Sequence, residues 1–144
     1  MGQENTFFTA IKSRVAAVMN GGSVAFPRVF ITNSVNLEEL VKVPRFPVAV
    51  ISPDEGATIN ATNGKILNGE FHITIIVMRP RDHIGETATL DLMDLSDLLV
   101  TAMEYDNDNS RFNYVSRTSP DTVNLDQATI VARSITFNYM YQRT

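Results

Sequence analysis

Apolar and polar residues alternate most regularly in the stretch that ends at residue 78. The apolar members of this alternation are Phe71, Ile73, Ile75 and Val77. A period of two in β-branched residues is typical of a half-buried strand, and it predicts a strand over residues 65–78. The Arg79-Pro80-Arg81-Asp82 turn should end this strand, because proline has no N–H for a sheet hydrogen bond.

One dipeptide inside this predicted strand leaves its shape open. Asn68-Gly69 is a turn signal in the middle of the stretch. It is compatible with a long strand that carries a bulge. It is equally compatible with a tight hairpin that joins residues 65–67 to residues 70–71.

Two other stretches carry apolar residues at helical spacing. In the first, Phe8, Ile11, Val15 and Val18 predict a helix over residues 6–19, which Asn20-Gly21-Gly22 should end. In the second, Leu92, Leu95, Leu99 and Ala102 predict a helix that starts at Thr87 or Thr89 and ends near Tyr105. Three aspartates, Asp91, Asp94 and Asp97, fall on the opposite face of this second helix.

Weaker patterns predict four more strands and a short helix. The strands are expected over residues 29–32, 47–51, 112–116 and 128–141, and the short helix over residues 36–41. Prolines at positions 44, 47 and 53 favour an edge position for the strand 47–51, or lie at its ends. Segment 118–126 contains Ser119-Pro120-Asp121 and is expected to be a loop.

This order of elements predicts an α+β fold with one domain over residues 1–144. We expect a largely antiparallel sheet of four to five strands, with two main helices packed on one face and a short helix besides. The other face would carry small, polar and apolar side chains together. Its apolar members, Ile76, Met78, Ile130 and Met140, predict contact with a protein partner.

Composition is that of an ordinary globular chain. The 144 residues are 44% hydrophobic and 19% charged, with a formal net charge of −4. The basic residues are scattered, which does not favour nucleic-acid binding. No apolar run is long enough to span a membrane, the first residues do not resemble a secretory signal, and the absence of cysteine excludes disulfides and thiolate metal sites.

Residues capable of catalysis do not form a recognisable constellation. His72 and His83 have no metal-ligand neighbours at suitable spacing. The aspartates of the second helix should lie on one solvated or interfacial face with ordinary pKa values, and catalytic acid–base pairs need burial. We therefore expect no enzyme activity, no cofactor and no metal.

The densest charged feature is the turn over residues 79–83. It is either a solvated connection or an electrostatic contact with an acidic loop of a neighbouring subunit. The candidate acidic loops are Asp54-Glu55 and the segment from Asp106 to Asp108. The candidate interface residues are therefore Ile76, Met78, Arg79, Arg81, Asp54, Glu55, Ile130 and Met140.

The order and texture of the whole chain resemble one protein family. The segments that carry the resemblance are NLEEL at 36–40, FPVAV at 46–50, GEFHITIIV at 69–77, the helix at 90–103 and SITFNY at 134–139. In this order, after an N-terminal amphipathic helix, they resemble the tail terminator (tail completion) proteins of tailed bacteriophages, the minor tail protein U type. The family has no short residue motif, so no single functional residue is carried over.

The resemblance implies a structural virion protein. Such proteins form a hexameric ring on the head-proximal end of the tail tube, which stops tube growth and joins the tail to the head connector. The implied partners are copies of the chain itself, the tail tube protein and a connector or neck protein, with no direct nucleic-acid recognition and no membrane. Assembly would take place in the host cytoplasm.

Two other functions remain open from the sequence. The chain would also fit another phage neck, head-completion or tail component. A small-molecule-binding domain or an unrecognised enzyme would instead show a pocket with perturbed titratable groups. If the mixed sheet face is the interface, Ile76→Asp or Met78→Asp should abolish assembly and leave the monomer folded.

Overall fold

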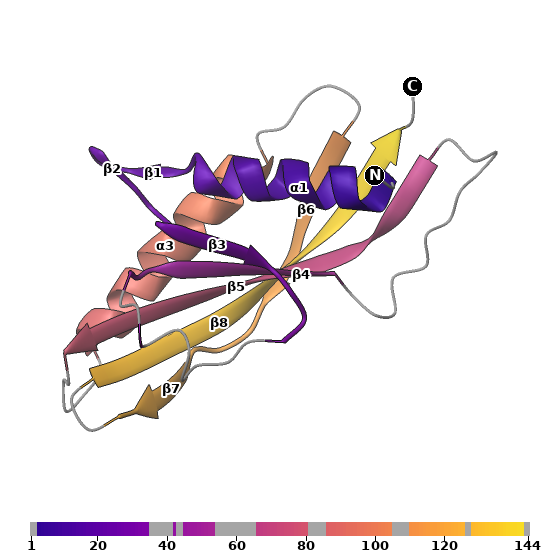
Figure 1. Cartoon of the computed structure of the whole chain (residues 1–144). Helices are drawn as coiled ribbons and strands as arrows, with labels where there is room; N and C mark the ends of the chain where they lie inside the picture. The colour runs from indigo at the N-terminus through magenta and orange to yellow at the C-terminus, as the bar shows by residue number, and fades with distance from the viewer. Residues whose placement is uncertain are drawn as a thin grey trace.

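The computed structural model describes residues 3–34, 42, 45–53, 66–80, 86–104, 110–125 and 128–142. Within these residues, the helices are α1 (Gln3–Ala16) and α3 (Glu86–Glu104). The strands are β1 (Met19–Asn20), β2 (Ser23–Val24), β3 (Arg28–Ile31), β4 (Val48–Pro53), β5 (Ile66–Pro80), β6 (Ser110–Arg117), β7 (Asp121–Asn124) and β8 (Ala128–Gln142). Figure 1 shows them in chain order.

Six of these strands form one mostly antiparallel sheet. Its order is β3-β4-β5-β8-β6, and β7 also pairs with β8, beyond the end of β6. Only the β3–β4 pair is parallel among the described strands. The α+β class is confirmed, but the expected sheet of four to five strands was too small, because segment 118–126 contains β7 and is not a simple loop.

The centre of the sheet is the long pair β5–β8. Each strand has 15 residues, and their antiparallel register runs without a shift from Ile66 opposite Gln142 to Pro80 opposite Ala128. The single long strand is therefore confirmed, whereas the hairpin and the bulge at Asn68-Gly69 are wrong. Gly69 is instead a site of close approach: a Cβ atom built there would lie 2.8 Å from the Tyr139 hydroxyl oxygen and 3.0 Å from the ring.

The glycines after the first helix have a different role from the predicted one. α1 ends at Ala16, and the chain then forms the small β1–β2 hairpin, with Met19 opposite Val24. Gly21 has a φ of 66°, a conformation that costs glycine little. The predicted helix over 6–19 therefore began and ended too late. Ala17 and Val18 follow the helix, and Met19 already belongs to the first strand of the hairpin.

The strand β4 lies in the interior of the sheet, between β3 and β5. The edge position considered for it is thus wrong, whereas the placing of prolines at its ends is correct. Pro47 immediately precedes the strand and Pro53 is its last residue. The predicted short helix over residues 36–41 lies outside the described residues.

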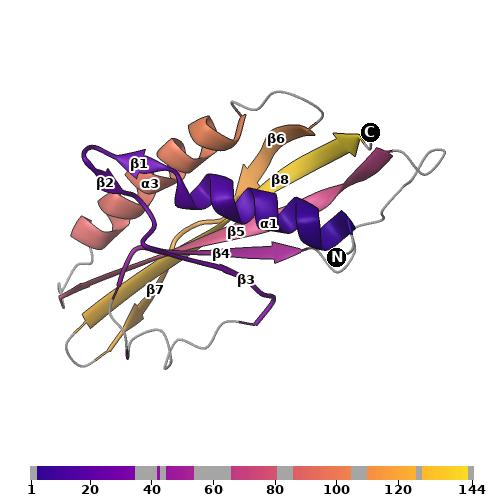
Figure 2. The same ribbon diagram turned by 45° about the horizontal axis from the view of Figure 1, so that its top comes forward.

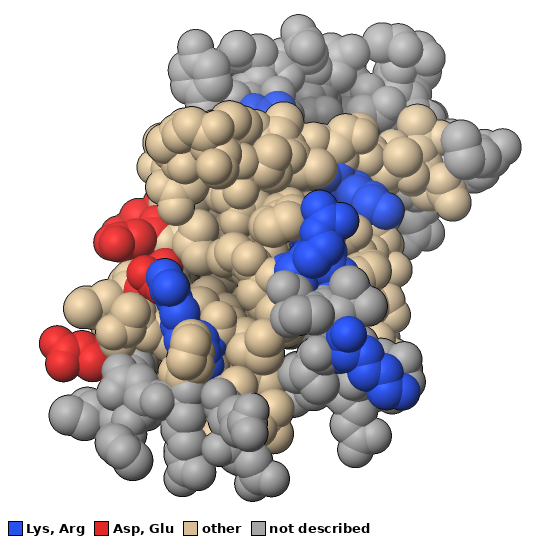
Figure 3. Space-filling model, turned by 60° about the vertical axis from the view of Figure 1, so that its left-hand side comes forward, with Lys and Arg blue, Asp and Glu red and all other residues tan. Residues whose placement is uncertain are grey.

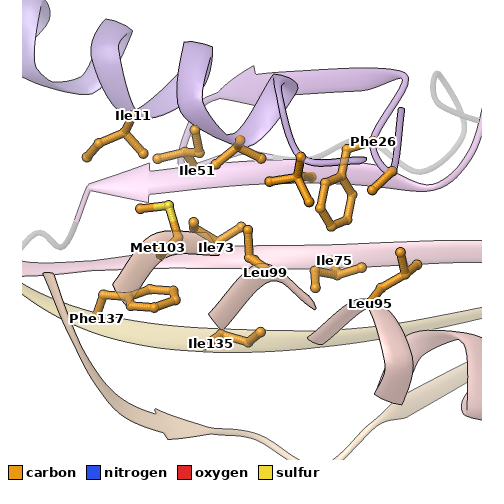
Figure 4. Close-up of a cluster of buried hydrophobic side chains, with 14 of the residues drawn as sticks. Ile11, Phe26, Ile51, Ile73, Ile75, Leu95, Leu99, Met103, Ile135 and Phe137 are labelled. Atoms are coloured by element: carbon orange, nitrogen blue, oxygen red, sulfur yellow. The ribbon is translucent and has the colours of Figure 1, made fainter. Parts of the chain in front are cut away.

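The main core fills the space between one sheet face and both helices (Figures 1 and 2). In Figure 4 the side chains of α1, α3 and the sheet point toward one another, among them Ile11, Ile73 and Leu99. Aromatic rings close one end of this core: the Phe7 and Tyr139 ring centroids are 4.6 Å apart and those of Phe71 and Phe137 are 5.5 Å apart. Pairs of this kind stabilise by about 0.5–1.5 kcal/mol beyond area burial.

Two arginines link the helices to neighbouring elements through hydrogen bonds. Arg14 of α1 donates through Nε and Nη2 to the carbonyl oxygen of Ala102 in the last turn of α3, at 3.3 and 3.2 Å. That carbonyl lies where a helix carries partial negative charge. Arg133, which interrupts the apolar face of β8, donates to the carbonyl oxygen of Thr118 at 3.1 Å and to the hydroxyl of the buried Ser96 at 3.4 Å.

Candidate interaction surface

A second group of buried side chains lies on the sheet face opposite the helices. Val48, Val50, Ile76 and Ile130 are each at most 2% exposed, and Met78 is one of the partly buried side chains packed against them. We call these four buried residues the second cluster. Its four side chains are buried within a single chain, so Ile76 and Ile130 are not accessible to a partner.

The other predicted interface residues differ in exposure, and several of them lie outside the described residues. Met78 is half-buried and Arg79 is exposed at the end of β5. Asp54, Glu55 and Arg81 lie outside the described residues, as do His83 and the segment from Asp106 to Asp108. Met140 belongs to β8, but its side chain is not among those described. The interface assignment as a whole stays a prediction, and Met78 and Arg79 are the two members of it that are described with side chains at least partly exposed.

Arg79 has an ionic partner in its own chain. Its Nε donates to Oδ2 of Asp91 on α3 at 2.7 Å, and its Nη2 contacts the same carboxylate oxygen. The Arg79 side chain is 48% exposed and that of Asp91 is 32% exposed. The pair thus joins the end of β5 to the first half of α3.

We expect this ion pair to contribute less than about 1 kcal/mol to the free energy of unfolding, since solvent screens it. A double-mutant cycle with Arg79→Met and Asp91→Asn, followed by urea unfolding, measures the coupling. The coupling should fall further at high salt. A value that exceeds about 2 kcal/mol and does not change with salt would contradict the placement of this pair at the surface.

The other two aspartates of α3 differ from each other. Asp97 accepts a hydrogen bond from Nη1 of Arg117 at 2.9 Å. Arg117 also donates to the Tyr114 hydroxyl at 2.9 Å, and these two hydrogen bonds, that to Tyr114 first, raise the pKa of Arg117 above its ordinary value. Asp94 is exposed, and it has no polar partner among the described residues.

Asp91 and Asp94 form one wall of a cleft of about 370 Å³. The opposite wall is the β1–β2 hairpin, which contributes Asn20, Ser23 and Val24. Between the walls lie apolar residues from the segment just before β4, from the end of β5 and from α3. They are Phe46, Pro47, Val77, Met78 and Leu95.

Figure 3 looks toward the side of the molecule that carries the hairpin in Figure 1. Acidic side chains stand at its left edge, with a basic side chain beside them, and further basic side chains lie across its centre and right. The acidic side chains seen on this side thus gather at one edge, and the other basic side chains lie apart from them. That arrangement favours contacts in which acidic and basic areas of different molecules meet.

The pattern of the sequence did not reveal several exposed apolar residues. Leu90 and Met93 are 52% and 42% exposed on α3, and Met19 and Val24 are 50% and 46% exposed on the hairpin. The first pair could have been found, because both residues fall outside the leucine stripe of the helix. The hairpin also had a signal, Gly21-Gly22 between two short polar–apolar segments, which is typical of a two-residue hairpin turn.

His72 and Thr74 of β5 each have a hydrogen-bond partner on β8. Nδ1 of His72 lies 2.8 Å from Oγ1 of Thr136, and Oγ1 of Thr74 lies 2.9 Å from Oγ of Ser134. Within the described part of the chain, no group of three or more His, Asp or Glu side chains could hold a metal ion. None of the helices described is both long enough and apolar enough to cross a membrane.

Comparison with known proteins adds no family at this point. No protein-family model matches the sequence, and no curated protein matches it significantly.

Proposed function

We propose that the chain is a structural protein of a bacteriophage tail, which forms a ring on the head-proximal end of the tail tube. The observation that carries this proposal is the order of elements. A proline-flanked strand, a long strand, an amphipathic helix and a long closing strand follow one another as in the tail terminator proteins that the sequence resembles. The role would be to stop tube growth and to present a surface to the head connector.

The open sheet supports head-to-tail assembly of copies. Its two edges differ, with β3 on one side and β6 and β7 on the other. In the described part of the chain, no strand pairs with the outer sides of these edge strands. A ring requires two different surfaces that fit each other and close, and two unlike strand edges are surfaces of that kind.

The β6–β7 edge also carries exposed apolar side chains. Val115, Val123 and Leu125 there are 44%, 42% and 39% exposed. Exposed β-branched residues on an edge strand favour pairing with another strand. With Ile76 and Ile130 buried, we propose this edge, in place of the mixed sheet face, as the contact between copies.

Light scattering coupled to size exclusion tests the proposal on the complete chain. We expect a closed oligomer with the mass of six copies, either alone or after addition of polymerising tail tube protein. In the same mixture, the tubes should stop growing when the chain is present. A chain that stays monomeric with the tube protein, and leaves tube growth unchanged, would exclude the proposed function.

The edge contact makes a mutational prediction. Val115→Lys combined with Val123→Lys should abolish the oligomer and leave the monomer folded, because lysine on an exposed edge opposes strand pairing and both side chains are already in solvent. The matched control is Leu90→Lys combined with Met93→Lys, which places the same two charges at exposed apolar positions of α3, away from the sheet edge. Equal loss of assembly in both variants would rule out the edge as the specific contact.

A further inference from the structure

The cleft between the β1–β2 hairpin and α3 combines two features that do not serve the fold. It contains an exposed carboxylate, Asp94, without a described polar partner. It also contains exposed apolar surface from Val24, which is 46% exposed.

We propose that this cleft binds a lysine or arginine side chain carried by an extended segment of another protein chain. The inference deepens the proposed function, since such a segment would belong to an assembly partner. Binding of the segment itself does not require the ring.

The charge of the cleft fits a cation. Asp91 and Asp94 contribute two carboxylates and Arg79 contributes one guanidinium, which leaves one negative charge. Because Arg79 is already paired with Asp91, it does not offer a free cation to an anionic ligand. Asp94 lies in the third turn of α3, where the positive field of the helix N-terminus has faded, so its charge remains available.

The apolar part of the cleft fits the stem of the same side chain. Lysine and arginine bury their methylene groups along apolar surface while the charged head reaches a polar partner. Val24 and Pro47 offer that surface beside the carboxylates. An anionic or purely apolar segment would use only one part of this lining.

A metal ion fits less well than a side chain. The cleft brings together two carboxylates from the same helix, and one of them is engaged by Arg79. Hard divalent cations take six or more oxygen ligands, and no group of three or more metal-ligating side chains occurs among the residues described. The occupant that uses the carboxylates and the apolar surface together is therefore a cationic side chain.

The test is a titration of the complete, isotope-labelled chain with two short peptides, followed by amide NMR shifts. The first probe is acetyl-Ala-Arg-Ala-amide, and the comparison probe is acetyl-Ala-Gln-Ala-amide. We expect saturable shifts for the arginine peptide at the hairpin and at Asp91 to Leu95, and none for the glutamine peptide. Asp94→Asn should weaken binding about fivefold, which corresponds to the loss of a surface ion pair worth about 1 kcal/mol.

Asp121→Asn is the matched control. It removes the same charge from an exposed position on β7, which does not line the cleft, and it should leave the affinity unchanged. Three results would overturn the inference: no saturable shift, equal binding of both peptides, or equal binding to the Asp94→Asn variant. A ring that assembles without any peptide binding would refute the cleft alone, whereas peptide binding to a permanent monomer would refute the ring alone.

Discussion

Replacing Ile76 with aspartate is expected to unfold the protein under conditions where the wild type is folded. The side chain is 2% exposed and packs with Val48, Val50 and Ile130 in the second cluster. Truncating a buried isoleucine costs about 2–5 kcal/mol, and burying an unpaired carboxylate adds several more. Because a domain of this size is stable by about 5–15 kcal/mol, the substitution removes most or all of that stability.

Urea unfolding followed by circular dichroism measures this effect, with Ile76→Val as the conservative control, expected to cost about 0.5–1.5 kcal/mol. Met78→Asp should be milder, since Met78 is only half-buried. The expectation from sequence that Ile76→Asp would leave a folded monomer is thus contradicted by the burial of this side chain. An unfolding midpoint equal to that of the wild type would show that the second cluster is open in solution.

Gly69→Ala should lower the free energy of unfolding by about 1–3 kcal/mol, the usual cost of overpacking. The new methyl group would lie 2.8–3.0 Å from three atoms of Tyr139. The Tyr139 ring cannot easily move away, since it is 5% exposed and in contact with Phe7, Phe8 and Phe71. Thermal or urea unfolding gives the value directly.

Gly22→Ala provides the matched control, because a Cβ at that position meets no atom within 4 Å. Its effect should stay within about 0.5 kcal/mol. The penalty at Gly69 should also shrink when Tyr139→Ala removes the opposing ring, which a double-mutant cycle detects. Equal effects of alanine at Gly69 and Gly22 would show that the close approach to Tyr139 does not constrain the sheet.

The periodicity of apolar residues was sufficient to predict the elements that bury one continuous face. β5 was expected over 65–78 and spans Ile66–Pro80, and β8 was expected over 128–141 and spans Ala128–Gln142. The helix α3 spans Glu86–Glu104, close to its expected bounds. In each case the apolar stripe lies on the main core, so local sequence and packing agree.

Other features depend on residues far apart in the chain and have no local signal. The local sequence around Gly69 indicates a turn. The reason for a glycine there is the close approach of the Tyr139 side chain, which lies 70 positions later in the sequence. β7 is four residues long and wholly exposed, so no hydrophobic period marks it. The burial of Ile76 depends on β4 lying beside β5, which an alternating pattern in β5 cannot specify.

The same limit applies to the candidate surface. The sequence placed Asp91, Asp94 and Asp97 on one helix face and Arg79 at a strand end. It could not show that Arg79 and Arg117 would each take one of these aspartates and leave Asp94 exposed. The sequence could not predict the cleft either, because its walls come from the hairpin and from α3, which are about 70 residues apart in the chain.

The place of β8 in the sheet has a consequence for synthesis. This strand is the last of the described elements to leave the ribosome, yet it lies between β5 and the β6–β7 edge and carries the ring that Phe7 of α1 packs against. The earlier elements have no closed core until it emerges. Folding is therefore expected to await the emergence of β8 from the ribosome, and the apolar surface of the first helix stays exposed until then.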